Sequence, residues 1–454
     1  MMRYNAEKGG YSMDQTQDIN QALEAAKKVT ENFEGTRALP SYRRAEILQK
    51  VSEKIKENSE DFARLICEEV KKPLKEARRE VSRAVFTFNW AAEEAKRFGG
   101  EVLPLDLDKP SIGRLALTRP FPRGPALLIS PFNFPLNLVA HKVAPAMALG
   151  IPFVLKPAPQ SPKTAQKLME IIFKSDWPQG SAAALSCSNE AAERLVQSDL
   201  FAILSFTGSA QVGWRLKALS GKKHVVLELG GTAPLFIDQN ADLAFAAQRA
   251  AWGAFYYSGQ VCISVQRILV AAACYEPFKD FLLKEIAALK VGDPRDENTD
   301  IGPLIDQKSE QRVETWISEA VSQGARVLCG GKRRDGIFMP TLIENAPQNC
   351  KLSCEEVFGP VATLEQVSNS DEALKKMSEG AYGLQAGIFT NDLRLAHRAW
   401  DVLPFGGVII NDIPAFRSDA MPYGGNRSSG IGREGVRYAM EEYSQLKTLV
   451  LNFR

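Results

Sequence analysis

Apolar residues in the first hundred positions recur every three or four places, which is the spacing of one face of an α-helix. The pattern predicts a first helix capped by Asp18, two further helices that begin at Ser41 and Ser59, and a longer helix over about 74–97. We interpret the charged residues between the apolar positions as solvated helix faces and assign them no function. The N-terminal part of the chain is therefore expected to be helical.

Apolar and polar residues alternate from Ser111 to Pro120, a period that is typical of an extended strand with one buried face. Such a strand needs a neighbour, either in the same chain or in another subunit. The C-terminal segment 448–452 is also predicted to be a strand, and it is a natural partner for this ribbon.

Between Gly124 and Gly231, short apolar runs alternate with helical segments. The predicted strands are 126–129, 152–155, 182–185, 201–205 and 225–229, and the predicted helices are 137–149, 162–173, 190–197 and 210–219. Strand–helix units with wholly apolar strands indicate a parallel sheet covered on both faces. Ligands bind at the carboxyl ends of such strands, so side chains at those ends are candidates for chemistry.

A second α/β region follows Gly231. Its predicted helices are 240–257, 276–289, 316–323 and 393–402, and its predicted strands are 266–270, 327–329, 361–367, 385–389 and 407–410. A loop rich in glycine and serine follows at 422–432.

Composition narrows the class of protein. With 454 residues, of which 45% are hydrophobic and 24% charged, the chain is typical of soluble globular proteins with two or three domains. Lys+Arg 56 against Asp+Glu 54 argues against a nucleic-acid or anionic-membrane partner. No apolar run approaches the roughly 20 residues of a membrane span, and residues 1–10 lack the apolar core of a signal peptide. We therefore expect a cytoplasmic protein.

The seven cysteines are scattered and odd in number, which fits free thiols in a reducing cytoplasm better than a disulfide framework. Cys350 and Cys354 lie close together, but no second pair completes a zinc site, and the whole sequence has three histidines. We expect no metal.

Cys262 follows the small residues Ser258 and Gly259, and Glu228 stands at the end of an apolar run where a buried strand would stop. A nucleophilic thiol needs an open approach and a nearby base, and these two residues could supply both. Taken alone, however, a single cysteine in a large protein is more often a small buried hydrophobic residue.

Other strand ends carry further candidates, each with a plainer interpretation. Gly208 and Ser209 stand between a strand and a helix, where backbone N–H groups could bind a phosphate, or they form a plain tight turn. Lys156 could reach a ribose or a phosphate, or could be a surface lysine. Asn133 could donate to an oxyanion, or could be a turn residue. No Gly-x-Gly-x-x-Gly follows any strand of this sheet, so the usual dinucleotide fingerprint is absent.

Seven motifs, in order along the chain, together resemble the aldehyde dehydrogenase superfamily. They are Ser130-Pro-Phe-Asn-Phe-Pro135, Leu155-Lys-Pro157, Phe206-Thr-Gly-Ser209, Leu227-Glu-Leu-Gly-Gly231, Gly259-Gln-Val-Cys262, Glu355-Glu-Val-Phe-Gly-Pro360 and Gly430-Ile-Gly-Arg-Glu-Gly435. The resemblance extends from about residue 18 to the end of the chain. It favours the functional interpretation of every residue that matches.

The resemblance implies an α/β fold in three parts. These are a cofactor-binding domain built on a parallel sheet (residues 1–109 and 125–230), an α/β catalytic domain (231–428), and β oligomerisation strands (110–124 and 441–454). It also implies a homodimer or a homotetramer.

A mechanism follows from the same resemblance. The Cys262 thiolate would attack the aldehyde to give a thiohemiacetal, while the Asn133 amide and the Cys262 backbone N–H stabilise the oxyanion. Hydride would pass to the nicotinamide and leave a thioester, which water activated by Glu228 would hydrolyse to the acid.

NAD or NADP is the implied cofactor. The implied cofactor-binding residues are Phe132, Lys156, Gly208, Ser209, Glu356 and Phe358. In relatives, the lysine that matches Lys156 binds the adenosine ribose. The residues that match Gly208 and Ser209 lie against the pyrophosphate. Glu356 and Phe358 position the nicotinamide ribose and ring.

Two departures from the family pattern bear on specificity. Pro159 stands where many NAD-preferring relatives carry a glutamate that binds the adenosine ribose, so we predict that NADP is tolerated or preferred. His141 stands where relatives often carry a bulky aromatic residue in the substrate tunnel, and Asn137 nearby is polar too. A polar tunnel suits a small polar or anionic aldehyde. A histidine simply packed on that helix explains position 141 equally well.

The overall pattern is most similar to a bacterial or archaeal branch that includes lactaldehyde, non-phosphorylating glyceraldehyde-3-phosphate and sulfo- or phosphonoacetaldehyde dehydrogenases. The main hypothesis is a hydrolytic dehydrogenase of a small polar aldehyde. One alternative is a CoA-acylating dehydrogenase, although acylating relatives often lack the base at Glu228. Another is a non-catalytic binding protein, which would have no need of Cys262, Glu228 and Asn133 together.

Overall fold

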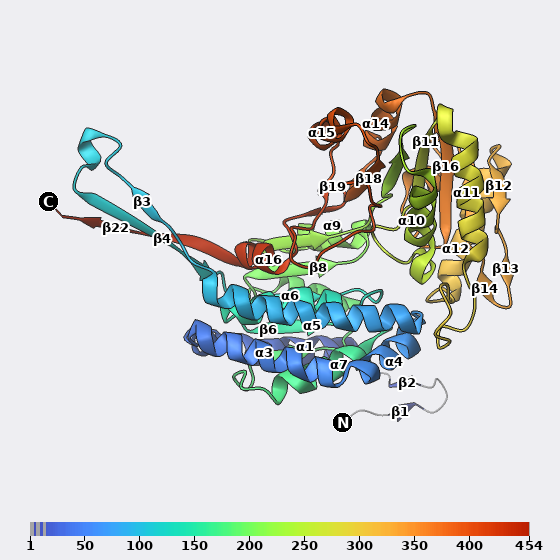
Figure 1. Ribbon diagram of the computed structural model, residues 1–454. Coiled ribbons are helices and arrows are strands. Elements are labelled where there is room, and N and C mark those ends of the chain that lie inside the picture. The colour runs from blue at the N-terminus through green and yellow to red at the C-terminus, as the bar shows by residue number, and fades with distance from the viewer. Residues whose placement is uncertain (1–3, 6–9, 12–14, 454) are drawn as a thin grey trace.

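The structure of the protein is a computed structural model that describes residues 4–5, 10–11 and 15–453. Two sheets with their covering helices form the body, and a narrow β arm extends away from it (Figure 1). A short antiparallel pair, β1 (Tyr4–Asn5) with β2 (Gly10–Tyr11), precedes the first helix.

The N-terminal helices are α1 (Gln15–Thr30), α2 (Phe33–Arg37), α3 (Ser41–Glu57), α4 (Ser59–Val70) and α5 (Leu74–Arg97). The predicted cap at Asp18 is wrong, because the polar residues before it are already helical. Asp18 instead accepts a hydrogen bond from the backbone N–H of Ser188 at 3.0 Å. The helix predicted from Ser41 does begin there, but Pro40 occupies the N-cap position.

The first sheet has the strand order β21-β9-β8-β5-β6-β7. Its parallel strands are β5 (Ala126–Ile129), β6 (Phe153–Lys156), β7 (Ala182–Ala184), β8 (Ile203–Thr207) and β9 (His224–Glu228), and β21 (Gly430–Ile431) is antiparallel to β9. The connecting helices are α6 (Asn137–Leu149), α7 (Pro162–Phe173), α8 (Asn189–Gln197) and α9 (Ala210–Leu219). The predicted parallel sheet is confirmed, and helices α3, α5 and α6 lie together on one side of it (Figure 1).

The second sheet has the order β12-β15-β16-β11-β10-β18-β19. Its strands are β10 (Pro234–Ile237), β11 (Arg267–Ala271), β12 (Arg326–Cys329), β15 (Thr341–Glu344), β16 (Val361–Val367), β18 (Gln385–Phe389) and β19 (Gly407–Ile410), of which β12 is antiparallel to β15. The helices here are α10 (Leu243–Phe255), α11 (Tyr275–Ala288), α12 (Gln307–Ser322), α13 (Lys351–Cys354), α14 (Ser370–Ser378) and α15 (Leu393–Val402).

Several features of this region differ from the prediction. Strands β10 and β15 and helices α13 and α14 were not predicted, because such short segments are ambiguous without their neighbours. Helix α12 begins at Gln307 rather than at 316. Asp306 caps it, because its side chain accepts a hydrogen bond from the Ser309 backbone N–H at 2.8 Å. The helix predicted over 240–257 ends at Phe255, and a 3-10 turn (Tyr256–Gly259) follows.

The arm consists of β3 (Val102–Pro104), β4 (Arg114–Pro122) and β22 (Ser444–Asn452). Strand β22 pairs antiparallel with β4 along its whole length, with Thr448 opposite Thr118, so the predicted pairing is confirmed (Figure 1). Helix α16 (Val436–Tyr443) connects β21 to this strand. The remaining short strands are β13 (Arg333–Arg334), β14 (Ile337–Phe338), β17 (Tyr382–Gly383) and β20 (Asn426–Arg427). Among the residues described, no helix combines the length and the apolar character that crossing a membrane requires.

Candidate active site

The turn that follows α10 presents Cys262 to a cavity. Tyr257 and Ser258 both adopt left-handed backbone conformations, with φ of 49° and 56°, so the chain reverses sharply after the helix. Gly259 has φ of 67°, and a Cβ there would lie 2.1 Å from the carbonyl oxygen of Gly359. Only glycine fits this position, which explains the Ser258-Gly259 pair before the cysteine.

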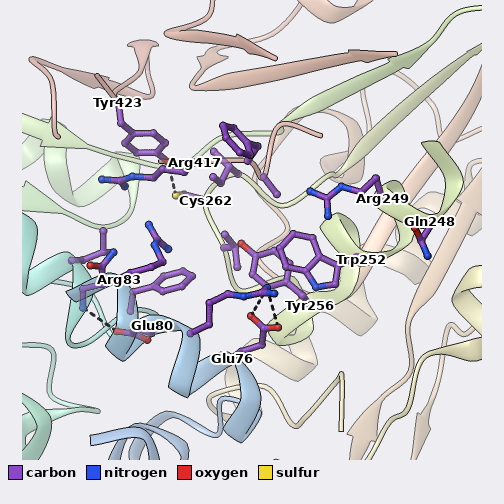
Figure 2. A pocket seen from close by; sticks show the side chains of 18 residues that line it. Glu76, Glu80, Arg83, Gln248, Arg249, Trp252, Tyr256, Cys262, Arg417 and Tyr423 are labelled. Atoms are coloured by element: carbon purple, nitrogen blue, oxygen red, sulfur yellow. Dashed lines mark hydrogen bonds and ion pairs between the residues drawn. The ribbon is translucent and has the colours of Figure 1, made fainter. Parts of the chain in front are cut away.

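The thiol sulfur of Cys262 lies 3.0 Å from the hydroxyl oxygen of Tyr423, and Figure 2 shows the two side chains facing each other. Both residues line a cavity of about 520 Å³. Burial raises the pKa of the Cys262 thiol to about 12, while the hydrogen bond from Tyr423 acts in the opposite direction.

Glu228 is the last residue of β9, and its side chain is buried. Both carboxylate oxygens are without a hydrogen-bond partner among the described residues. A Cβ at Gly424 would lie 2.9 Å from Glu228 Oε1, so the loop that carries Tyr423 passes directly against this carboxylate. Burial, and secondly the charge of Glu434, raise the pKa of Glu228 well above its usual value. A carboxyl group with these properties is suited to take a proton from water.

A buried charged cluster lies behind Glu228. Arg417 donates to Glu434 at 2.9 Å, and its guanidinium lies 3.9 Å from the centroid of the Tyr423 ring. Burial would raise the pKa of Glu434, but the charges of Arg417, His141 and Lys142, together with the hydrogen bond from Arg417, outweigh it and lower that pKa. Lys142 is also buried and donates to the Ser205 hydroxyl at 3.0 Å, and burial lowers its pKa.

Asn133 lies in the loop between β5 and α6, and its side chain is buried beside the cysteine turn. Its Nδ2 donates to the carbonyl oxygen of Gln260 at 2.9 Å, two residues before Cys262. A side-chain amide has two N–H donors, so a second one is left for a ligand. The structure therefore places Asn133 against the turn that carries Cys262, and Glu228 against the loop that carries Tyr423, the partner of Cys262.

The prediction that His141 lines the substrate tunnel is wrong. Its side chain is fully buried in α6 and is not part of the cavity lining, whereas Asn137 is. His141 Nε2 lies 2.8 Å from Asp419 Oδ1, and Arg83 donates to the same carboxylate through Nε and Nη2 at 2.9 and 2.7 Å. Burial alone would raise the pKa of Asp419, but His141 and Arg83 lower it well below its usual range. His141 thus packs as a structural partner of Asp419.

The interpretation of the charged residues of α5 as solvated faces is also wrong in part. Glu76, Glu80 and Arg83 line the cavity, and Glu80 is fully buried. Each is balanced by a partner of opposite charge on the cavity wall or behind it, which offsets the cost of burial. Sequence periodicity identifies the apolar stripe of a helix, but it does not show which of the remaining residues face a cavity.

The predicted cofactor residues Lys156, Gly208 and Ser209 lie at the carboxyl ends of β6 and β8. Ser209 is the N-cap of α9 and its side chain makes no capping hydrogen bond. The hydroxyls of Ser130 and Thr207, at neighbouring strand ends, are buried without a partner among the described residues. Unpartnered donors at a helix N-terminus fit the pyrophosphate and ribose hydroxyls of a dinucleotide.

The other predicted cofactor residues lie nearer the cysteine. Glu356 accepts from the backbone N–H of Gly231 at 3.3 Å, and burial raises the Glu356 pKa to about 7. Phe358 has φ of 45° and meets Phe132 edge to face, with ring centroids 5.9 Å apart. The segment that carries Glu356 and Phe358 approaches the cysteine turn, because Glu356 contacts Gly231 and Gly359 lies against Gly259. Its polar and aromatic residues fit the nicotinamide end of the predicted cofactor.

Sequence reasoning missed several residues of this site: Arg83, Lys142, Arg417, Asp419 and Tyr423. Tyr423 belongs to the 422–432 loop, whose glycines signal a close backbone approach. The others carry no local pattern that separates them from surface charges.

Comparison with known proteins agrees with this geometry. A profile described as "Aldehyde dehydrogenase family" matches residues 5–449. The chain belongs to the aldehyde dehydrogenase family. This dehydrogenase oxidises an aldehyde with NAD or NADP, so the hypothesis of a non-catalytic binding protein is wrong.

Three relatives illustrate the similarity of this dehydrogenase to characterised proteins. The 3-sulfolactaldehyde dehydrogenase of Priestia aryabhattai is 41% identical over 436 residues, which are 96% of this chain and 90% of the relative. The structure of aldehyde dehydrogenase 21 from Physcomitrella patens, in complex with the reaction product succinate, is 42% identical with a TM-score of 0.93, covering 98% of this chain and 92% of that one. Glyceraldehyde-3-phosphate dehydrogenase of Methanocaldococcus jannaschii, complexed with NADP, is 38% identical with a TM-score of 0.92, covering 96% and 94%.

Proposed function

We propose that this dehydrogenase oxidises a small aldehyde that carries an anionic group, with Cys262 as the nucleophile. The observation that carries the proposal is the cavity itself, which holds the Cys262 thiol and is lined by four arginines: Arg79, Arg83, Arg249 and Arg417. Figure 2 shows Arg83 and Arg417 near the cysteine and Arg249 farther along the cavity. A guanidinium is well suited to bind a carboxylate, sulfonate or phosphate group.

The arginines retain donors for such an anion although each is paired. Arg83 uses two N–H groups for Asp419, and Arg249 uses its Nε for Asp412 at 2.7 Å. A guanidinium has five N–H donors, so both keep some for a ligand. The relatives agree with this proposal, since they include a 3-sulfolactaldehyde dehydrogenase and an aldehyde dehydrogenase in complex with its reaction product succinate.

The residues divide the reaction into two easier halves. The Cys262 thiolate adds to the carbonyl carbon, and the oxyanion receives hydrogen bonds from the Asn133 amide and the Cys262 backbone N–H. Bound at the strand ends, NAD or NADP supplies the hydride acceptor that turns the thiohemiacetal into a thioester. Glu228 then removes a proton from water, the hydroxide adds to the thioester, the C–S bond breaks, and the acid leaves with Cys262 again a thiolate.

The cofactor residues are proposed to act as the resemblance implies, with Lys156 on the adenosine ribose or its 2′-phosphate. Pro159, which is exposed three residues later, puts no negative charge against that phosphate. We therefore propose that NADP is tolerated or preferred, in agreement with the NADP complex of the Methanocaldococcus jannaschii relative.

The CoA-acylating alternative is disfavoured by Glu228, because a base beside the thioester promotes hydrolysis. Adding CoA and searching for acyl-CoA product distinguishes the two.

We further propose that residues 1–109 and 125–230 form the cofactor domain and 231–428 the catalytic domain. We propose a cytoplasmic homodimer or homotetramer joined through the arm, since Leu446, Leu449 and Phe453 leave much of its surface apolar and exposed.

The test is an initial-rate screen with NAD and with NADP over anionic aldehydes, such as 3-sulfolactaldehyde and the semialdehyde of succinate. Butanal serves as the neutral control of matched chain length. We expect kcat/KM for the succinate semialdehyde to exceed that for butanal at least about tenfold, which corresponds to about one charge-assisted hydrogen bond. Equal or better turnover of butanal would contradict an anion-binding cavity, and unchanged turnover in Cys262→Ser would contradict the nucleophile.

A further inference from the structure

We propose that Tyr423 is a further catalytic residue, whose hydroxyl donates a hydrogen bond to the Cys262 sulfur and so increases the thiolate fraction at neutral pH. The inference rests on the proposed role of Cys262 as the nucleophile. It starts from the 3.0 Å separation between Cys262 Sγ and Tyr423 Oη, which is the side-chain hydrogen bond of this thiol.

The direction of the hydrogen bond follows from the ionisation of the two groups. Burial raises the pKa of the Tyr423 hydroxyl well above its usual value, so the phenol keeps its proton. A thiolate can only accept, whereas a thiol is both a weak donor and a weak acceptor. Once Cys262 is ionised, the hydrogen bond can therefore run in only one direction, from the Tyr423 hydroxyl to the Cys262 sulfur. A donor to the thiolate favours the ionised form of the cysteine.

The need for such a donor follows from the surroundings of the sulfur. Burial works against the thiolate, and cysteine nucleophiles are often activated by an adjacent histidine. The three histidines of this chain are elsewhere. His141 lies against Asp419, His224 Nε2 lies 2.6 Å from Glu442, and the ring centroid of His397 lies 5.9 Å from that of Trp400. Tyr423 is therefore the hydrogen-bond donor placed against the nucleophile. The charge of Arg417 also favours the thiolate, whereas the charges of Glu356 and Glu228 oppose it.

Two contacts hold the Tyr423 ring for this task. The guanidinium of Arg417 lies 3.9 Å from the ring centroid, and a cation over the ring draws electron density from the phenol and strengthens it as a donor. On the other side, Gly424 allows the chain to pass against Glu228, where a Cβ would collide with the carboxylate. The loop that carries Tyr423 is thus held against the proposed base, while the hydroxyl contacts the nucleophile.

The test is the pH dependence of alkylation at Cys262, followed by mass spectrometry of the Cys262 peptide so that the other cysteines do not interfere. Tyr423→Phe keeps the ring and its stacking on Arg417 but removes the donor. Losing a hydrogen bond to a charged group shifts a pKa by about one to two units, so we expect the alkylation midpoint to rise by that amount. The kcat/KM at neutral pH should fall about 3- to 10-fold, because the loss of thiolate is partly offset by the greater nucleophilicity of a more basic thiolate.

The rate below the midpoint reports the same shift, because burial places the Cys262 midpoint near pH 12. At any given lower pH the alkylation rate of Tyr423→Phe should fall by less than its thiolate fraction, because a less stabilised thiolate is more nucleophilic. The matched control is Tyr256→Phe, which removes a phenol from the same cavity and leaves the Cys262–Tyr423 pair intact, so its midpoint should not move. An unchanged or lower midpoint in Tyr423→Phe would overturn the proposal.

A second variant keeps the test decisive if Tyr423→Phe fails to fold. A ring-fluorinated tyrosine at position 423 is a stronger donor of nearly the same shape, so the midpoint should fall, and a midpoint that stays in place would overturn the proposal. Failure of the underlying function is recognised separately. If Cys262→Ser keeps its dehydrogenase activity, the nucleophile is misassigned, whereas a misassigned Tyr423 leaves Cys262→Ser inactive and the alkylation midpoint unmoved.

Discussion

The ammonium of Lys72 and the carboxylate of Glu80 form an ion pair in which neither side chain has any exposed surface. The other oxygen of Glu80 accepts from the backbone N–H groups of Leu136 and Asn137 at 2.8 and 3.1 Å. The pair thereby ties helix α5 to the start of α6, directly after the loop that carries Asn133. A buried charge pair holds the oxyanion side of the proposed site in place.

Neutralising one partner of this pair should destabilise the protein. Glu80→Gln leaves the Lys72 ammonium buried without its counter-charge, and burial already lowers the Lys72 pKa. We expect the free energy of unfolding to fall by about 3–5 kcal/mol, measured by urea denaturation. Lys72→Met combined with Glu80→Gln should cost clearly less than the sum of the single changes. Additive losses would show that the two groups are not coupled.

Arg83 should discriminate between anionic and neutral aldehydes. We expect Arg83→Gln to raise KM for the succinate semialdehyde about 10- to 100-fold, because a charge-assisted hydrogen bond is lost. Butanal reports any general disturbance of the cavity through Asp419, so its KM should change far less. Arg78→Gln is the matched control on the same helix, because Arg78 pairs with Glu60 and Glu297 and is not part of the cavity lining. An equal loss for both aldehydes would argue that Arg83 is structural.

The pH dependence of kcat should reflect the raised pKa of Glu228. A general base works only when deprotonated, so the deacylation rate should rise with pH through a midpoint above the ordinary glutamate value of about 4.3. Glu434 contributes to the raised pKa by its negative charge. Glu434→Gln should therefore move the midpoint to lower pH. The substitution also removes the negative charge paired with Arg417, so the positive charge of Arg417 lowers the Glu228 pKa further. A midpoint that moves upward would contradict this electrostatic account.

Pro159 should determine tolerance of the 2′-phosphate. Pro159→Glu introduces a carboxylate near Lys156, which would repel the phosphate of NADP and bind the ribose hydroxyls of NAD. We expect kcat/KM with NADP to fall at least about tenfold, with little loss for NAD, and the NADP defect to shrink at high salt because the charges are exposed. Equal effects on both cofactors would place the adenosine ribose elsewhere.

Most of the fold could be predicted because its elements have strong local patterns. Helix α5 and strands β5, β16 and β18 were predicted with their observed bounds, since each combines a clear period with glycine or proline at a boundary. The pairing of β4 with β22 was also predicted, although the strands are far apart in the sequence, because both are extended segments in need of a partner. Strand β10 was not, since four apolar residues after two glycines look like a loop.

The site was predictable where motifs mark it and not where tertiary packing creates it. Cys262, Glu228 and Asn133 stand beside glycines, prolines and strand ends that signal their exposure to a ligand. The sequence left His141 open between a tunnel position and packing on the helix. The packed interpretation is correct, because Asp419 on a distant loop holds the histidine in the interior. The contacts of His141 with Asp419 and of Tyr423 with Cys262 join segments that are far apart in the sequence. The local sequence pattern therefore cannot predict them.

The most direct test of the central claim is to trap the covalent intermediate. Glu228→Gln removes the proposed base but leaves the nucleophile, so the thioester should accumulate when the variant is mixed with NADP and the best anionic aldehyde, then quenched in acid. The predicted result is about one acyl group per chain, found on the peptide that contains Cys262 and absent from Cys262→Ser. An acyl group on another cysteine, or product formed with no adduct at any time, would contradict the account.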